Sequence, residues 1–192
     1  MPLNHASQYS ALTEAQYAFI GRAVVEWANV EFLLGTVLAR LLATPEFLAR
    51  TYTDAISAVR LQVAITEAVE VHARRYGHRL VSRELLDEVR AVNGRVASLR
   101  GQRNKLAHFC WMRTNDDELF GTSFPGGVPS PKTEKREYAT LTTRDLKYLN
   151  DESHLVVEQL IKIVKRLPEI TEESLLAAQS SGQRTAAARG GR

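Results

Sequence analysis

An arginine and a histidine stand five residues apart in the stretch Arg103–His108, which reads RNKLAH. A guanidinium stays charged at physiological pH and can stabilise the negative charge that builds up on a phosphate during its transfer. An imidazole can accept and return a proton near neutral pH. These two groups are the minimum equipment for cleaving a phosphodiester without a metal ion, so this stretch is the first candidate for a catalytic site.

The stretch lies near the end of a segment with apolar residues at three- and four-residue spacing, which predicts a helix over residues 82–108, reaching Trp111 at the furthest. Arg103 interrupts the apolar stripe of this helix. Residues five apart are separated by about 140° around an α-helix. Arg103 therefore faces the apolar seam, whereas His108 shares a neighbouring ridge with Asn104. A single site containing both requires a helix that loosens near His108, or a second subunit.

A second charge interrupts an apolar stripe in the first predicted helix, over residues 13–43. Glu31 stands where a leucine is expected between Trp27 and Leu34. A buried charge without a partner is strongly destabilising, so we expect Glu31 and Arg103 to form an ion pair between the first and third helices. The alternative role for such a pair is structural, namely to fix the register of the two helices. The full stripe expected for the first helix is Ile20, Val24, Trp27, Leu34, Leu38 and Leu41.

Similar periodicity predicts two more long helices, over residues 54–76 and 142–167. Capping-box patterns precede the first and last helices, at Thr13 with Gln16 and at Thr142 with Asp145. Glycines and prolines break the periodicity over residues 114–141, which predicts a long loop or a small β-hairpin that pairs 118–124 with 137–141. The expected fold is therefore all-α, with four long helices in an up-down bundle and an insertion before the last helix.

The expected organisation is an N-terminal arm (1–12), a helical domain (13–168, with the insertion at 114–141) and a disordered basic tail (169–192). Cys110 is the only cysteine, which excludes an intramolecular disulfide and a multi-cysteine zinc site. The histidines have no metal-ligand spacing, so we expect neither a metal nor a cofactor. Without a signal peptide or an apolar run of membrane-spanning length, we expect a cytoplasmic protein that does not enter a membrane.

The net charge of +3 is less informative than its distribution. A local basic surface fits a polyanionic partner such as RNA, and the alternative is an ordinary solvated helix face. Between Glu88 and Asp116 the chain has no acidic residue and six cations, which are Arg90, Arg95, Arg100, Arg103, Lys105 and Arg113.

Arg103, Asn104 and His108 match the Arg-x4–6-His motif of HEPN domains, in which a polar residue often follows the arginine. The chain also resembles that family in its layout over residues 13–167. A long first helix carries Trp27-x3-Glu31, the motif lies late in the third long helix, and a variable segment precedes the last helix. In a subgroup paired with nucleotidyltransferase antitoxins, the motif continues to a tyrosine that becomes modified. The corresponding residue here is a cysteine, so that mode of neutralisation is not implied.

The resemblance implies a metal-independent endoribonuclease of a toxin–antitoxin or antiviral-defence system, acting as a homodimer with two motifs facing each other across a cleft. The 2′-hydroxyl of RNA attacks the adjacent phosphate and leaves a cyclic phosphate. Carried onto this chain, His108 is the general base or acid, Arg103 stabilises the phosphorane, and Asn104 orients the phosphate or the histidine. Arg100 and Lys105 guide the RNA backbone. RNA, a second copy of the chain and an antitoxin or regulatory protein are the implied partners.

Two other interpretations fit the same residues. Some HEPN proteins are inactive scaffolds, and the chain would then be a helical binding or dimerisation module without catalysis. An unrelated helical bundle, for example a regulator, also matches the pattern of helices. Growth arrest on expression that is relieved by His108→Ala or Arg103→Ala distinguishes the enzyme from both.

Overall fold

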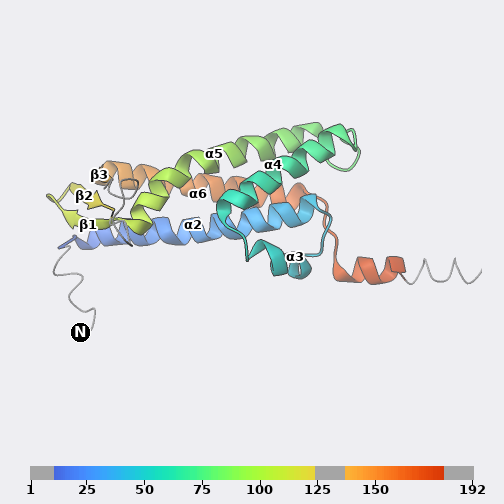
Figure 1. Cartoon of the computed structure of the whole chain (residues 1–192), viewed down its shortest axis with the longest axis horizontal. Coiled ribbons are helices and arrows are strands. Elements are labelled where there is room, and N and C mark those ends of the chain that lie inside the picture. Colours follow the sequence, from blue (N-terminus) through green and yellow to red (C-terminus); the bar gives the residue numbers. More distant parts are fainter. Residues whose placement is uncertain (1–10, 124–136, 180–192) are drawn as a thin grey trace, which may run out of the picture. The chain divides into compact units, whose positions relative to one another are not determined.

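A computed structural model describes residues 11–123 and 137–179 of the chain (Figure 1). This part is mostly helical, with one small antiparallel sheet. The elements are α2 (Glu14–Leu41), α3 (Glu46–Thr53), α4 (Ala58–Arg74), α5 (Arg83–His108), β1 (Cys110–Arg113), β2 (Glu118–Thr122), β3 (Tyr138–Thr142) and α6 (Thr143–Arg166). The four long helices expected from periodicity are confirmed, each end within four residues of its predicted position.

The chain divides into two compact units. The first unit comprises Met1–Val30 and Arg95–Glu158, and it contains the sheet and the stretch Arg103–His108. The second unit comprises Glu31–Gly94 and Gln159–Arg192, and it contains α3 and α4.

The core of the first unit is apolar, and several polar side chains at its edge are paired, although Asn150 Oδ1 is buried without a hydrogen-bond partner among the described residues. Asn150, which is 3% exposed, donates from Nδ2 to the carbonyls of Phe19 at 3.1 Å and Leu146 at 3.0 Å. Arg95 on α5 forms an ion pair of 2.7 Å with Glu152 on α6. These contacts satisfy groups that would otherwise destabilise the core. The buried apolar residues are Ala23, Trp27, Val30, Val96, Leu99, Leu106, Trp111, Leu119, Leu146, Leu149, Val156 and Val157.

The buried stripe of α2 differs from the one expected. Val24 is 45% exposed, whereas Ala23 and Val30 are 3% and 0% exposed. The prediction that Val24 belongs to the core was wrong because α2 has apolar residues on its exposed face as well, and periodicity alone does not choose between the two phases. Glu31 accordingly lies beside the buried position of Val30, and it is half-buried.

Both predicted capping boxes are confirmed. At the start of α2, Gln16 donates its backbone N–H to Thr13 Oγ1 at 3.2 Å, and the Thr13 N–H donates to Gln16 Oε1 at 2.9 Å. At the start of α6, the Thr142 N–H donates to Asp145 Oδ2 at 2.8 Å, and the Asp145 N–H donates to Thr142 Oγ1 at 3.1 Å. Each box satisfies backbone donors that have no partner inside the helix.

The sheet has the order β1-β2-β3, and both pairings are antiparallel. The pairing of β2 with β3, which places Glu118 opposite Thr142, confirms the predicted hairpin. β1 was not predicted, and Trp111 belongs to this strand rather than to the preceding helix. Trp111 lies opposite Gly121, where an added Cβ would be 2.6 Å from the indole ring, so only glycine leaves room for it.

In the second unit, α4 and α5 are joined by a reciprocal pair of hydrogen bonds. Gln62 Nε2 donates to the Asn93 carbonyl, and Asn93 Nδ2 donates to the Gln62 carbonyl, each at 2.9 Å. His72 is 5% exposed, and its Nε2 lies 2.8 Å from the Leu41 carbonyl. None of the helices in the described ranges combines the length and the apolarity needed to cross a lipid bilayer.

The segment after α6 departs from the disordered tail expected from residue 169. Residues 172–179 are helical, and Ser174 donates its N–H to Thr171 Oγ1 at 3.1 Å, as at a helix start. Glu169 forms an ion pair of 2.8 Å with Arg40. The prediction of disorder rested on a composition rich in small and polar residues, which does not reveal these local contacts. The rest of the expected tail (180–192), most of the expected arm (1–10) and residues 124–136 of the insertion lie outside the described residues.

Candidate active site at the end of helix α5

The last turn of α5 is regular up to His108. The Phe109 N–H donates to the Lys105 carbonyl at 3.0 Å, and β1 begins directly afterwards. Trp111 folds back from β1, and its indole Nε1 donates to the Leu106 carbonyl at 3.1 Å. That bond satisfies one of the carbonyls left without a partner at the end of a helix. The helix therefore does not loosen before His108.

Arg103 continues the buried stripe of α5, as its spacing predicts. Leu99 and Leu106 on either side of it are 6% and 4% exposed, and Arg103 itself is half-buried. Its guanidinium carbon lies 5.5 Å from the centroid of the Trp27 ring on α2. Because Trp27 is 1% exposed, this contact places the cation at the edge of the apolar core.

Asn104 also contacts the guanidinium. Arg103 Nη1 donates to Asn104 Oδ1 at 3.2 Å. Asn104 is exposed and lies four residues before His108, so the two share a ridge of α5. Asn104 therefore contacts the arginine while lying on the same face of the helix as the histidine.

His108 is the last residue of α5, and it is exposed. Within residues 11–123 and 137–179 its ring has no hydrogen-bond or ion-pair partner. Because α5 is helical from Arg103 to His108, their positions are about 140° apart around the helix axis. One copy of the chain thus presents the two groups on different sides of α5.

The cations expected to form a basic surface are partly neutralised. Arg90 lies 3.0 Å from Glu70 and 2.6 Å from Asp87, and Arg113 lies 3.4 Å from Asp116. Arg95 is also in an ion pair, as described above. Arg90, Arg95 and Arg113 therefore belong to ordinary ion pairs rather than to a basic surface for RNA. The remaining cations of the run are Arg100, Arg103 and Lys105, all half-buried.

The contact of Arg103 with the Trp27 indole was not predicted from the sequence. The pairing of Arg103 with Glu31 stays a prediction, since the two belong to different units. Trp27 was visible in the sequence as a large aromatic residue one turn before Glu31. An arginine in an apolar seam can be stabilised by the face of an aromatic ring. Trp27 is the only aromatic residue in the predicted stripe of the first helix, so the sequence already singled it out as the candidate for this contact.

Within the described ranges no three histidine, cysteine, aspartate or glutamate side chains are close enough together to hold a metal ion. The candidate site consists of an anchored arginine, an exposed histidine and the amide of Asn104 on the last two turns of α5. Such groups can bind a phosphate and transfer a proton. No protein-family model matches the chain, and no curated protein and no solved structure matches it either.

Proposed function

We propose that this protein is a metal-independent endoribonuclease of a toxin or antiviral-defence type, with a HEPN-like up-down bundle of four long helices. The observation that supports the proposal is the placement of Arg103. Its guanidinium contacts a buried tryptophan and an asparagine oxygen, and an exposed histidine follows five residues later at the end of the same helix. A cation fixed in this way loses little conformational freedom when it binds a phosphate.

The proposed reaction is an internal transfer at phosphorus. His108 takes the proton from a ribose 2′-hydroxyl while the 2′-oxygen attacks the adjacent phosphate. The bond from phosphorus to the 5′-oxygen breaks, and that oxygen receives a proton from water, while His108 returns its proton to the solvent. The products are a 2′,3′-cyclic phosphate and a 5′-hydroxyl. Arg103 stabilises the charge on the phosphorane oxygens, and Asn104 orients the phosphate or the histidine.

The active form in this proposal is a homodimer with composite sites. Since Arg103 and His108 diverge around α5, a site that uses both takes the arginine from one copy and the histidine from the other. Arg100 and Lys105 then guide the RNA backbone toward the site. An antitoxin or regulatory protein that covers the end of α5 would block it. The proposed compartment is the cytoplasm, where RNA is available.

The second candidate function is a helical binding or dimerisation module without catalysis. It is favoured by the exposure of His108, which has no side chain among the described residues to hold its ring in one orientation. Catalytic histidines usually have such a group, which also selects the tautomer.

The deciding experiment incubates the purified protein with total RNA in the presence of a chelator, beside its His108→Ala variant. His154→Ala is the matched control, since His154 is also exposed but lies 3.4 Å from Glu26. We expect the unaltered protein and His154→Ala to produce RNA fragments with cyclic phosphate ends, and His108→Ala to leave the RNA intact. Identical RNA patterns with all three proteins would remove the enzymatic proposal and leave the binding module.

A further inference from the structure

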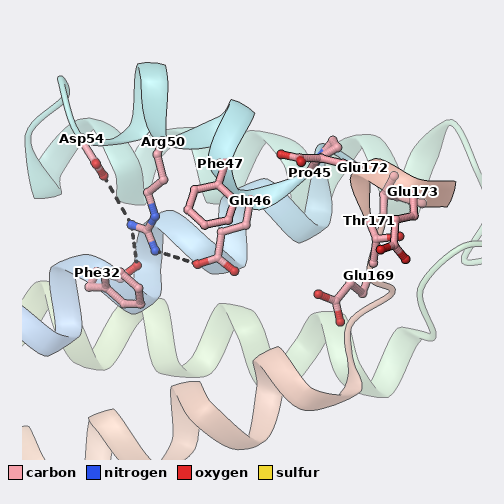
Figure 2. A pocket seen from close by; sticks show the side chains of 11 residues that line it. Phe32, Pro45, Glu46, Phe47, Arg50, Asp54, Glu169, Thr171, Glu172 and Glu173 are labelled. Carbon is pink, nitrogen blue, oxygen red and sulfur yellow. Dashed lines mark hydrogen bonds and ion pairs between the residues drawn. The ribbon is translucent and has the colours of Figure 1, made fainter. Parts of the chain in front are cut away.

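A separate cavity lies within the second unit, where the start of α3 faces residues 169–173 (Figure 2). Its volume is about 830 Å³, and this is within the range of small-molecule sites in proteins. Phe32, Pro45, Phe47 and Ile170 supply its apolar walls. Phe47 is 81% exposed, so its ring is available to a ligand rather than used in the core. The walls therefore suit a ligand with an apolar body.

The charge around this cavity is strongly negative. Its lining includes the carboxylates of Glu46, Asp54, Glu169, Glu172 and Glu173 and the guanidinium of Arg50, and Arg40 beside the lining is paired with Glu169. Figure 2 shows Glu169, Glu172 and Glu173 on the segment that faces α3. Glu172 and Glu173 form no ion pair with any of the described residues. The carboxylates thus exceed the local cations, and this selects against an anionic ligand.

Arg50 belongs to the wall of the cavity and does not offer a binding site for an anion. Its guanidinium carbon lies 3.7 Å from the centroid of the Phe32 ring. Its Nη2 donates to Thr36 Oγ1 at 2.8 Å and to Glu46 Oε1 at 3.1 Å. Its Nη1 donates to the Phe32 carbonyl and to Asp54 Oδ1, each at 3.3 Å. Both terminal nitrogens are therefore engaged within the protein.

We propose that this cavity binds a small organic cation, in which a protonated amine is attached to an aromatic or aliphatic body. The apolar body packs against Phe47 and Ile170, and the ammonium group lies toward Glu172 and Glu173. An aromatic wall adds attraction for the cation through its π face. A bare metal ion does not fit, because among the described residues no three carboxylate, histidine or cysteine side chains are close enough together to hold one. This site is independent of the proposed ribonuclease activity.

The test uses two probes with the same aromatic body and opposite charge, 2-phenylethylamine and 3-phenylpropionate. Each is titrated at pH 7 into the full chain labelled with nitrogen-15, and the amide shifts are followed by NMR. We expect the amine to shift amides around Phe47, Arg50 and residues 169–173, and to bind more weakly as salt is added. The propionate should leave these amides unchanged.

Two variants and their controls test the assigned contacts. Glu173→Gln should weaken the amine about two- to fivefold, as expected for a solvent-exposed ion pair, while Glu67→Gln, at another exposed glutamate of the same unit, should have no effect. Phe47→Ala should weaken it about tenfold through lost apolar contact. Leu80→Ala is its control, because Leu80 is 57% exposed and lies outside the cavity lining.

Several outcomes would overturn the proposal. Equal shifts with both probes would mean that the cavity binds apolar bodies without regard to charge. No shifts with the amine up to millimolar concentrations would mean that the cavity is no ligand site. The dipeptide amide Phe-Arg is titrated as a third probe. If it binds and the amine does not, the cavity is a surface for peptides. Selective binding of the amine that is lost in Phe47→Ala and kept in Leu80→Ala would support the proposal.

Discussion

The guanidinium carbon of Arg103 lies 5.5 Å from the centroid of the Trp27 ring, joining α5 to α2 within the first unit. The contact explains how an arginine occupies a stripe that otherwise consists of aliphatic residues. Its methylene groups extend the apolar stripe while its charged end lies on an aromatic face. Such a contact contributes about 0.5–2 kcal/mol, and it also limits the directions in which the guanidinium can point.

Replacing Arg103 by lysine distinguishes the contribution of its positive charge from the contribution of its planar guanidinium group. Lysine keeps the positive charge but lacks the planar group that stacks on an indole and donates two parallel hydrogen bonds to a phosphate. We expect Arg103→Lys to lower kcat/KM for RNA cleavage at least about tenfold while the free energy of unfolding changes by less than about 1.5 kcal/mol. Cleavage assays and urea denaturation measure the two effects. Full activity in Arg103→Lys would show that a point charge is sufficient.

A mixture of two inactive variants tests whether the site is shared between copies. In a composite site, a dimer of one Arg103→Ala chain and one His108→Ala chain has one site with both mutations and one site with neither. We expect random mixing to restore about a quarter of the unaltered activity, because half of the dimers are mixed and half of their sites are intact.

The control for this mixing experiment combines each variant with itself after the same denaturation and refolding. If the mixture is as inactive as the separate variants, then the arginine and histidine of one site come from the same chain, or each site requires both copies of both residues. Size-exclusion chromatography with light scattering establishes that mixed dimers were formed.

Lys105 should contribute to RNA affinity through charge alone. It forms no ion pair with any residue of the described ranges, and a lysine beside a phosphate releases bound counterions. In a His108→Ala background, Lys105→Gln should reduce the slope of log affinity against log salt by about 0.7 for single-stranded RNA. Fluorescence anisotropy measures the slope. Lys162→Gln, at an exposed lysine on α6, should leave it unchanged, and an equal reduction there would mean that binding is not localised to α5.

Two glycines should respond in opposite directions to alanine. At Gly121 an added Cβ would lie 2.6 Å from the Trp111 ring, so Gly121→Ala should destabilise the protein by about 1–3 kcal/mol. At Gly101, in the exposed part of α5, no atom lies within 4 Å of an added Cβ. Gly101→Ala should therefore stabilise the protein by about 0.5–1 kcal/mol. Thermal denaturation of both variants measures the effects, and a stable Gly121→Ala protein would contradict the packing of Trp111 against β2.

The capping box of α6 should make stability depend on acid. The Thr142 side chain and then its backbone N–H donate hydrogen bonds to Asp145, and they lower the pKa of this carboxyl. A lowered folded-state pKa means that the contribution to stability is present above the unfolded-state pKa and is lost as pH falls through the folded-state value. Asp145→Asn should thus reduce stability at pH 7 by less than about 1 kcal/mol, and the difference should shrink below about pH 4.

Urea denaturation across this pH range measures the effect. Asp151→Asn is the control, since Asp151 is exposed on the same helix and makes no hydrogen bond or ion pair with the described residues. A difference for Asp145→Asn that stays constant between pH 7 and pH 3.5 would contradict the role of the charged carboxylate.

Local signals in the sequence were sufficient for much of the fold. The capping boxes at Thr13 and Thr142 act within four residues, and the stripe through Leu99 and Leu106 repeats along α5. β1 could not be predicted in this way. Its four residues have no clear alternation, and the strand exists because β2 supplies hydrogen-bond partners and a glycine opposite Trp111.

The candidate site was only partly predictable for a similar reason. The position of Arg103 in the stripe follows from helical period, but its partner depends on which face of α2 is buried. An error of one residue at Ala23 and Val24 turns that face by about 100°, and this uncertainty of phase explains why the contact with Trp27 was not predicted.

The junctions around the sheet constrain how this chain can vary in length. Only Phe109 separates α5 from β1, and β3 passes into α6 without an intervening residue. Side chains alternate faces along a strand, so one inserted residue after His108 would turn Trp111 away from the core and shift every pair with β2. Insertions and deletions among relatives of this chain should therefore accumulate in the connection between β2 and β3, and the number of residues from Arg103 to Arg113 should stay fixed.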